Sequence, residues 1–157
     1  MKIGVSGHQN IPHDAASFVE EGVAEVLNHA PDPVTGVSSL AAGADQLFAQ
    51  TVLHRGGQLH VVLPCARYED TFANAEDLET FRALLRRADT VEELPERKPS
   101  EEAFLKAGLR VVDLSDLLIA VWDGMPARGK GGTADIVAYA KRRHVPIEIV
   151  WPAGVLR

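Results

Sequence analysis

The chain has 157 residues, of which 46% are hydrophobic and 24% are charged, and its formal net charge is −6 at pH 7. These proportions are those of an ordinary globular protein, and no apolar stretch is long enough to cross a membrane. The acidic balance argues against sequence-independent binding of nucleic acid, which requires a basic surface. The single cysteine, Cys65, excludes an internal disulfide framework and is typical of a reducing compartment.

The first residues have the pattern of a strand and lack the cleavage site of a signal peptide, so we expect a cytoplasmic protein. No linker, repeat or low-complexity segment interrupts the chain, which predicts one domain over residues 1–157. Strand-like and helix-like patterns alternate within it. In chain order they predict a strand over 3–6, a helix beginning near Pro12, a strand over 35–39, a helix over 43–55, a strand over 58–63, a helix around 78–85, a short strand over 90–94, a helix after Ser100, a strand over 117–122, a helix over 133–143 and a strand over 146–150.

Periodicity and capping residues carry these assignments. Val19, Val23 and Leu27 follow the helical period, Gly56 ends the second helix, and Ser100 has the place of an N-cap. The strands are apolar on both faces, which is typical of a parallel sheet covered by helices on both sides. Ligands of such sheets bind beyond the carboxyl ends of the strands. The loops that follow strands, at 7–10, 38–45, 64–68 and 123–133, are therefore the places where we expect a site.

The loop over 123–133 is the most informative. An apolar strand leads into a glycine-rich segment that opens directly into a helix, and this arrangement presents backbone N–H groups to an anion. The segment from Gly124 to Lys130 nearly matches a phosphate-binding P-loop, but Gly131 stands where Ser or Thr would hold magnesium. We expect Gly131, Gly132 and Thr133 to hold a phosphate, the alternative being a plain surface turn.

The loop over 38–45 combines small residues with hydroxyls. Ser38 and Ser39 offer donors, and Gly43 allows close approach to the backbone. Asp45 lies near a helix start, where a carboxylate is stabilised by the helix dipole. It either caps the helix or contacts a ligand or a neighbouring loop.

Several single residues complete the candidate set. His8 and Gly7 border the first loop, and His8 is expected to contact a ligand, since its spacing to His13 does not indicate a metal site. Pro64 ends a strand, beside Cys65, for which a buried thiol is expected. The aromatic residue that stacks on a base is either Tyr68 or Trp122.

Two of these loops resemble known families. The segment from Ser38 to Ala49 resembles the signature of DNA-processing protein A, and Gly129 to Thr133 resembles the glycine-glycine-threonine loop of the Lonely Guy phosphoribohydrolases. Both families belong to the SLOG superfamily. The resemblance implies an α/β fold, namely a Rossmann-like three-layer sandwich with a mostly parallel sheet and helices on both faces. It also implies a nucleotide-like ligand and a homo-oligomer, for which the helix with Phe81 and Leu85 and the helix with Phe104 are candidate surfaces.

The resemblance is incomplete at the catalytic position. Lonely Guy enzymes carry a glutamate three residues after the loop threonine, where this chain has Ile136, and Asp135 lies one position early. One step along a helix turns a side chain by about 100°, so Asp135 is expected to face elsewhere. We therefore expect a nucleotide-binding module or sensor. The alternatives are a nucleoside 5′-monophosphate phosphoribohydrolase, with Asp45 or Asp135 as weak catalytic candidates, and a single-stranded DNA-binding module.

The predicted ligand site gathers the loop residues named above. No cofactor or metal is implied beyond a nucleotide-like ligand, no membrane contact is expected, and nucleic acid is an unfavoured partner. The predicted ligand-contacting residues are Gly7, His8, Ser38, Ser39, Gly43, Asp45, Pro64, Tyr68, Asp123, Gly131, Gly132 and Thr133.

Overall fold

The computed structural model describes residues 1–126 and 132–155. It contains a six-stranded sheet with the order β4-β3-β2-β1-β5-β6, in which every pairing is parallel. The strands are β1 (Lys2–Gly7), β2 (Thr35–Ser38), β3 (Gln58–Leu63), β4 (Thr90–Glu93), β5 (Leu117–Val121) and β6 (Ile147–Ile149). The helices are α1 (His13–His29), α2 (Ala44–His54), α3 (Ala75–Arg86), α4 (Glu101–Leu114) and α5 (Thr133–Arg142), with a short 3-10 helix η1 (Tyr68–Thr71).

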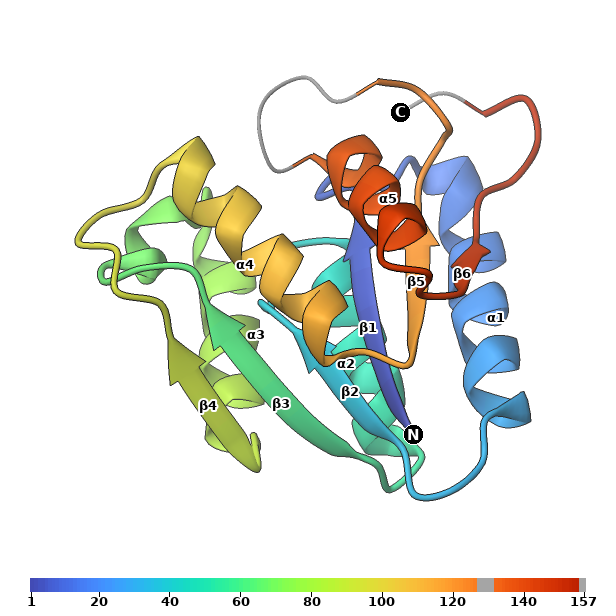
Figure 1. Ribbon diagram of the computed structural model, residues 1–157, viewed down its shortest axis with the longest axis horizontal. Coiled ribbons are helices and arrows are strands. Elements are labelled where there is room, and N and C mark those ends of the chain that lie inside the picture. Colours follow the sequence, from blue (N-terminus) through green and yellow to red (C-terminus); the bar gives the residue numbers. More distant parts are fainter. Residues whose placement is uncertain (127–131, 156–157) are drawn as a thin grey trace.

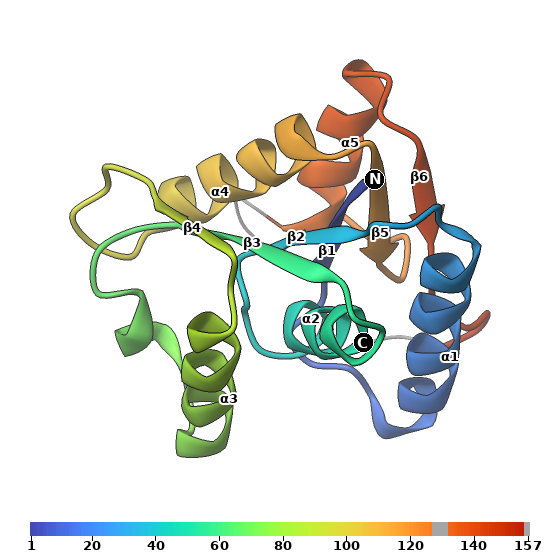
Figure 2. The same ribbon diagram turned by 90° about the horizontal axis from the view of Figure 1, so that it is seen from below.

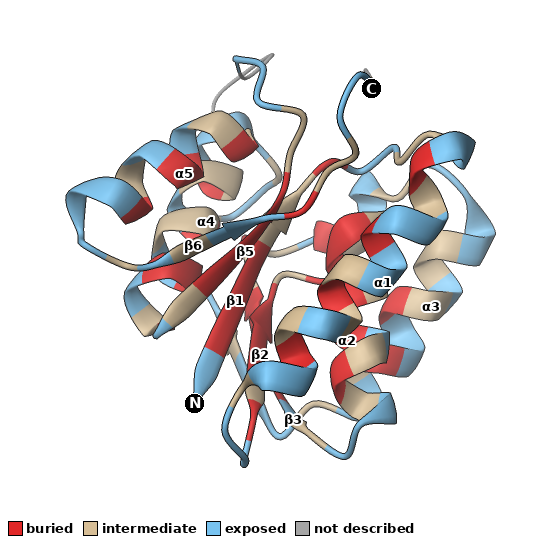
Figure 3. Ribbon diagram, turned by 90° about the vertical axis from the view of Figure 1, so that its right-hand side faces the viewer, coloured by how far each residue is buried: buried red, intermediate tan, exposed pale blue. Residues whose placement is uncertain are grey.

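The sheet is the middle of three layers. Seen along its edge, α4 and α5 lie on one face, and α1, α2 and α3 lie on the other (Figure 2). The central strand β1 is buried along most of its length (Figure 3), where Ile3 and Val5 are almost fully covered. This burial on both faces explains the continuous apolar run of the neighbouring strand β5, whereas the edge strands β4 and β6 are mostly exposed. The predicted α/β class and Rossmann-like sandwich are confirmed, with a sheet that is parallel throughout the described residues.

Two packed clusters fill the spaces between the layers. The larger one lies mainly under α1, α2 and α3 and is centred on Phe48, and the smaller one lies under α4 and α5 around Leu118 and Ile136. Phe81, expected on an exposed surface of α3, is only 1% exposed and packs in the larger cluster. That expectation was wrong, because α3 turns this side of its apolar stripe toward η1 and the core.

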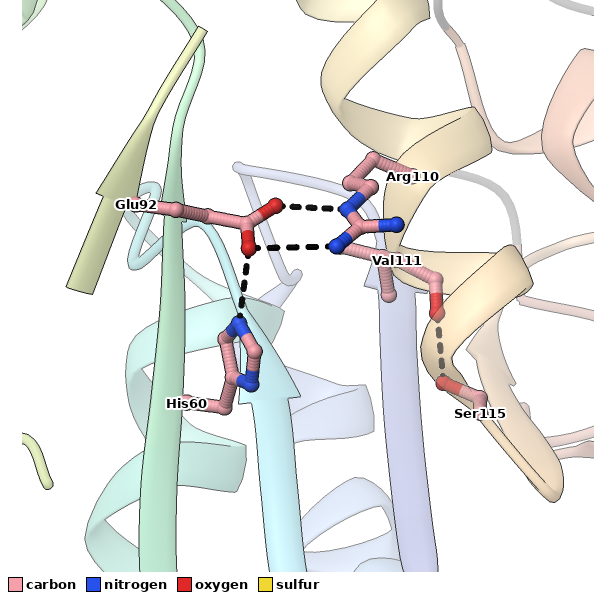
Figure 4. Close-up of polar contacts among 5 residues, drawn as sticks. All are labelled: His60, Glu92, Arg110, Val111 and Ser115. Carbon is pink, nitrogen blue, oxygen red and sulfur yellow. Dashed lines mark hydrogen bonds and ion pairs between the residues drawn. The ribbon is translucent and has the colours of Figure 1, made fainter. Parts of the chain in front are cut away.

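A polar contact ties α4 to the edge of the sheet (Figure 4). Arg110 donates from Nε to Glu92 of β4 over 2.6 Å, and Glu92 lies 3.1 Å from Nε2 of His60 on β3. Hydrogen bonding with Arg110, and then with His60, holds the pKa of Glu92 below its usual range against partial burial. The contact fixes α4 across β3 and β4, and α4 in turn supports one wall of the cavity described next.

Candidate functional site

A cavity of about 670 Å³ opens beyond the carboxyl ends of the strands. The chain runs outward from β1 to β4 and then returns to place β5 on the other side of β1, so the strand order reverses between β1 and β5. Open parallel sheets bind ligands at this switch point. The described residues that line the cavity include Ser6, Gly7, His8, Gln9, Asn10, Ser39, Ala41, Ala42, Asp45, Pro64, Tyr68, Thr71, Phe72, Ala73, Asn74, Asp77, Phe104, Gly108, Gly132, Thr133 and Ile136.

His8 joins the loops at the base of the cavity. Its backbone N–H donates to Val121 at the end of β5, and its Nε2 accepts the N–H of Asp123 over 3.1 Å. The same Nε2 lies 3.3 Å from Oδ1 of Asp123, and the ring meets Trp151 edge-on at 5.1 Å. His8 lines the cavity but is only 6% exposed. Its ring therefore mainly connects the end of β1 with the loop after β5, and little of it is exposed to a ligand.

Gly43 holds the second loop against the first. It has a φ of 79° and a ψ of −124°, and a Cβ placed there would lie 2.2 Å from the carbonyl oxygen of Gln9. This approach allows the N–H of Ala44 to reach the carbonyl of His8. Only glycine combines this backbone conformation with so little space. Gly43 shapes the cavity floor without lining it.

Asp45 brings a buried carboxyl to the cavity wall. Its exposed fraction is 9%, and burial raises its pKa to about 7, although hydrogen bonds from Ala41, the Ser38 side chain and Ser39 oppose that shift. These partners lie at the end of β2 and in the loop that follows it, and no side chain caps α2, whose N-cap is Gly43. Of the two roles expected for Asp45, helix capping is therefore not the one that its contacts favour.

The start of α5 forms another part of the cavity wall. Gly132 is the N-cap, with no side-chain hydrogen bond to the helix, and both Gly132 and Thr133 line the cavity. Ile136, 1% exposed, also lines it and packs on Gly108 of α4. Asp135 is exposed and is not part of the lining. The wall thus offers backbone donors and an aliphatic side chain where the resembling enzymes have a glutamate.

Aromatic side chains form a third wall. The Tyr68 ring lies 5.5 Å from Phe72 and 6.3 Å from Phe104, edge to face in both cases, and all three line the cavity. Asn74 and Asp77 form its polar rim, where Asn74 Oδ1 caps the start of α3 by accepting the N–H of Asp77. Four of these lining residues are not among the ones predicted from the sequence, namely Phe72, Asn74, Asp77 and Phe104. The only local sign of this wall was the Asn74 cap before α3.

The structure brings most of the predicted residues together and separates a few. Gly7, His8, Ser39, Asp45, Pro64, Tyr68, Gly132 and Thr133 line one cavity. Ser38 is fully buried, where its Oγ accepts the N–H of Leu40. Asp123 accepts from Met125 and contacts His8.

Trp122 and Gly131 were also predicted as parts of the site. Trp122 donates from its ring N–H to the carbonyl of Met125 and is not part of the lining, so of the two predicted aromatic residues Tyr68 is the one that lines the cavity. Gly131 lies outside the described residues, as do Gly129 and Lys130 of the glycine-rich loop. Cys65 is buried, and burial, with the charges of Glu93 and Glu96, raises the pKa of its thiol.

The cavity carries little positive charge on its described walls. No Lys or Arg is among the described lining residues, and the acidic ones are Asp45 and Asp77. Within residues 1–126 and 132–155, no three side chains come together that could hold a metal ion. No described helix is long and apolar enough to cross a membrane. Because the described lining contains no Lys or Arg, it can offer an anion backbone N–H groups and uncharged polar side chains, but no Lys or Arg side chain.

Solved structures of other proteins share this arrangement. The chain is similar to DNA processing protein A from Streptococcus pneumoniae (TM-score 0.74, 20% identity, 99% of this chain and 51% of that one). It is also similar to DNA processing protein A from Helicobacter pylori, described for its single-stranded DNA binding (TM-score 0.71, 16% identity, 95% of this chain and 64% of that one). The chain has the Rossmann-like fold that these DNA processing proteins share.

A third similar structure is the molybdenum cofactor carrier protein of Chlamydomonas reinhardtii (TM-score 0.57, 18% identity, 94% of this chain and 75% of that one). No protein-family model and no curated protein sequence matches the chain. The chain spans about half to two thirds of the two DNA processing proteins. At these identities the likeness establishes the fold alone and names no ligand.

Proposed function

We propose that this SLOG-type chain acts as one domain that binds a nucleotide or a nucleotide-derived small molecule in the cavity beyond the strand ends. The observation that carries the proposal is the pairing of two unlike walls across one cavity. One wall is the uncapped start of α5, and the other is the aromatic wall of Tyr68, Phe72 and Phe104. A nucleotide is complementary to these two walls, because it carries an anionic phosphate at one end and a flat aromatic base at the other.

The phosphate end is assigned to Gly132 and Thr133. Among the described residues, the N–H groups of Thr133 and Ala134 donate no backbone hydrogen bond, and the first bonds of α5 run from Asp135 and Ile136 to Gly132. Unpaired N–H groups at a helix start carry partial positive charge and bind oxyanions. The absence of Lys and Arg from the described lining leaves this helix start as the anion-binding group on those walls.

Gly132→Val tests the phosphate end. The backbone at Gly132 has φ −68° and ψ 162°, which valine adopts without strain, so the fold should persist. The branched side chain should block the N–H groups and weaken binding of nucleoside 5′-monophosphates at least tenfold in calorimetry. Ala138→Val, at an exposed position of the same helix, is the matched control and should bind as the wild type does. Equal affinity of a folded Gly132→Val protein and the wild type would contradict the assignment.

A second candidate function is cleavage of the bond between base and ribose phosphate. The observation in its favour is Asp45, a carboxyl in the cavity wall whose pKa of about 7 suits a general acid or base. Ile136 occupies the place of the family's glutamate, and Asp135 faces away from the lining. Incubation with a panel of nucleoside 5′-monophosphates should therefore release little free base. Robust release that Asp45→Asn abolishes, with binding retained, would make the protein an enzyme.

Binding of single-stranded DNA is the remaining alternative, and the likeness to DNA processing protein A favours it. The net charge of −6 and the described cavity lining oppose it. Fluorescence anisotropy with a labelled oligonucleotide at two salt concentrations distinguishes the cases. We expect no binding at physiological salt, whereas tight binding that weakens steeply with salt would favour a DNA-binding module.

A further inference from the structure

The hydrogen bonds of Asp45 account for most of its acceptor capacity. An ionised carboxylate has about four acceptor positions on its two oxygens. Three partners are present, namely the backbone at Ser39 and Ala41 and the side chain of Ser38, and they lie between the last residue of β2 and the start of α2. About one position is left for a proton or for a donor on a ligand. Because Asp45 lines the cavity, that position is the one a ligand can meet.

The groups around Asp45 do not supply a compensating charge. Tyr68 faces it from η1, and burial together with the charges of Asp45 and Cys65 raises the pKa of the phenol, which stays neutral. Asp77 of α3 adds a second carboxyl to the lining, and His8 lines it from the end of β1. No Lys or Arg belongs to the described lining. A negative charge on Asp45 is therefore opposed by burial and is not balanced by a cation on these walls.

We infer that Asp45 meets the ligand as a neutral carboxylic acid, so that the cavity takes up one proton together with an anionic ligand. The inference rests on the proposed nucleotide-like ligand. It explains how the cavity can bind an anion beside the carboxyl of Asp45. A neutral acid donates its O–H to an acceptor of the ligand, such as a phosphate, ribose or base oxygen. An ionised Asp45 would instead repel the anion and would require a donor at the same position.

The direction of the pH dependence follows from the burial of Asp45. Its pKa is raised to about 7 in the folded protein, so both forms are present near neutral pH. If only the acid form binds, affinity is greatest below pH 7 and falls as the pH rises, by up to tenfold per pH unit. The phosphate of a nucleoside monophosphate, with a second pKa of about 6, is fully charged above pH 7 and adds no slope there.

The first measurement needs no ligand. Triple-resonance NMR on the wild-type protein follows the side-chain carboxyl carbon of Asp45 between pH 4 and 9. We expect a midpoint near 7 for Asp45, and the same spectra follow Asp14. Asp14 is a matched comparison, because it is the second residue of α1 as Asp45 is of α2, yet it is exposed and lies outside the cavity. A midpoint near 4 for Asp45 would overturn the inference whether or not any nucleotide binds.

The second measurement is calorimetry with a nucleoside 5′-monophosphate at pH 7.0, 7.75 and 8.5. We expect the wild-type and Asp14→Asn proteins to lose affinity progressively over this range. Repeating the titration in two buffers of different ionisation enthalpy should show uptake of up to one proton per ligand, approached at the upper end of the range. Asp45→Asn keeps a neutral donor of the same shape, so its affinity should be flat with pH and exceed that of the wild type at pH 8.5.

The outcomes separate this inference from the function on which it rests. A flat wild-type profile, or an undiminished slope in folded Asp45→Asn, would overturn the inference, and the latter would point to His8 or another group. Nucleotide binding that Gly132→Val abolishes would still support the proposed function in either case. Absence of binding to every monophosphate at every pH would sink both the function and the ligand-linked step.

Discussion

The two helix starts that border the cavity, those of α2 and α5, both begin after a glycine but differ in what satisfies them. At α2, the N–H groups of Ala44 and Gln46 donate to carbonyls of His8 and Ala41, so neighbouring loops close the helix end. At α5, the described residues provide no such partner for Thr133 or Ala134. A helix end closed by its own protein is part of the scaffold. A helix end left open beside a cavity has donors to spare for a ligand.

The charge of the two regions differs in the same sense. The α2 side places the buried carboxyl of Asp45 in the wall, whereas the α5 side presents backbone dipoles and the aliphatic Ile136. An anionic group is thus favoured near α5 and disfavoured near an ionised Asp45. The following predictions test this division of roles, beginning with the largest expected effect.

Asp45 should make the stability of the protein depend on pH. Its pKa is raised from 3.8 to about 7 by folding, so the folded state holds the proton more tightly than the unfolded state. The resulting stabilisation is complete below pH 4 and is lost as the pH rises through 7. The free energy of unfolding should therefore fall, relative to Asp45→Asn, by up to about 4 kcal/mol between these limits. Urea unfolding at several pH values measures the difference, and parallel profiles would contradict it.

Gly43→Ala should destabilise the protein at the start of α2, where two loops meet. The new Cβ would meet the backbone of Gln9 and His8, and the residue would have to keep a φ of 79°, so we expect a loss of about 3 kcal/mol or more. Gly56→Ala is the matched control, because Gly56 has the same φ with nothing within 4 Å. It should cost about 1 kcal/mol, from the backbone conformation alone. Equal costs in denaturant unfolding would show that the contact between the two loops is unimportant.

Gly108→Ala should have a smaller effect on stability, at the contact between α4 and α5. A Cβ there would lie 2.3 Å from Cδ1 of Ile136, the end of a flexible side chain that can shift. We expect about 1 kcal/mol of destabilisation and a several-fold loss of nucleotide affinity, because the side chain of Ile136, which lines the cavity, must change its position. Adding Ile136→Val should recover part of both losses. No recovery in the double variant would indicate that the two positions are not coupled through this contact.

Self-association is the prediction with the smallest expected effect on the cavity. The resemblance to SLOG proteins favours a homo-oligomer, and after the burial of Phe81 the helix with Phe104 is the candidate surface that remains. Sedimentation at tens of micromolar should show a species larger than the 17.0 kDa chain. A monomer with full nucleotide affinity would contradict the expectation and show that one chain completes its own cavity.

The local patterns predicted the elements closely because the central strands are largely buried and the helices carry a clear apolar period. The strand predicted over 58–63 is β3 without change, and Ser100 caps α4 by accepting the N–H of Ala103. The errors are mostly one residue at element ends, as for the helix predicted over 43–55, which spans Ala44–His54. The 3-10 helix at Tyr68–Thr71 was missed, because so short a segment carries no periodicity.

The layered α/β fold and the strand ends at which the cavity lies can be predicted from local patterns in the sequence. Apolar strands, helical periods and glycines at loop positions are local signals, and the parallel arrangement follows from them. Which loop residues face the cavity depends instead on how the elements pack together. In the folded chain, Ser38 is buried and Asp123 contacts His8. Phe72 and Phe104, from distant segments, line the same cavity. Side-chain direction and desolvation depend on packing between elements far apart in the chain, and no local pattern records that packing.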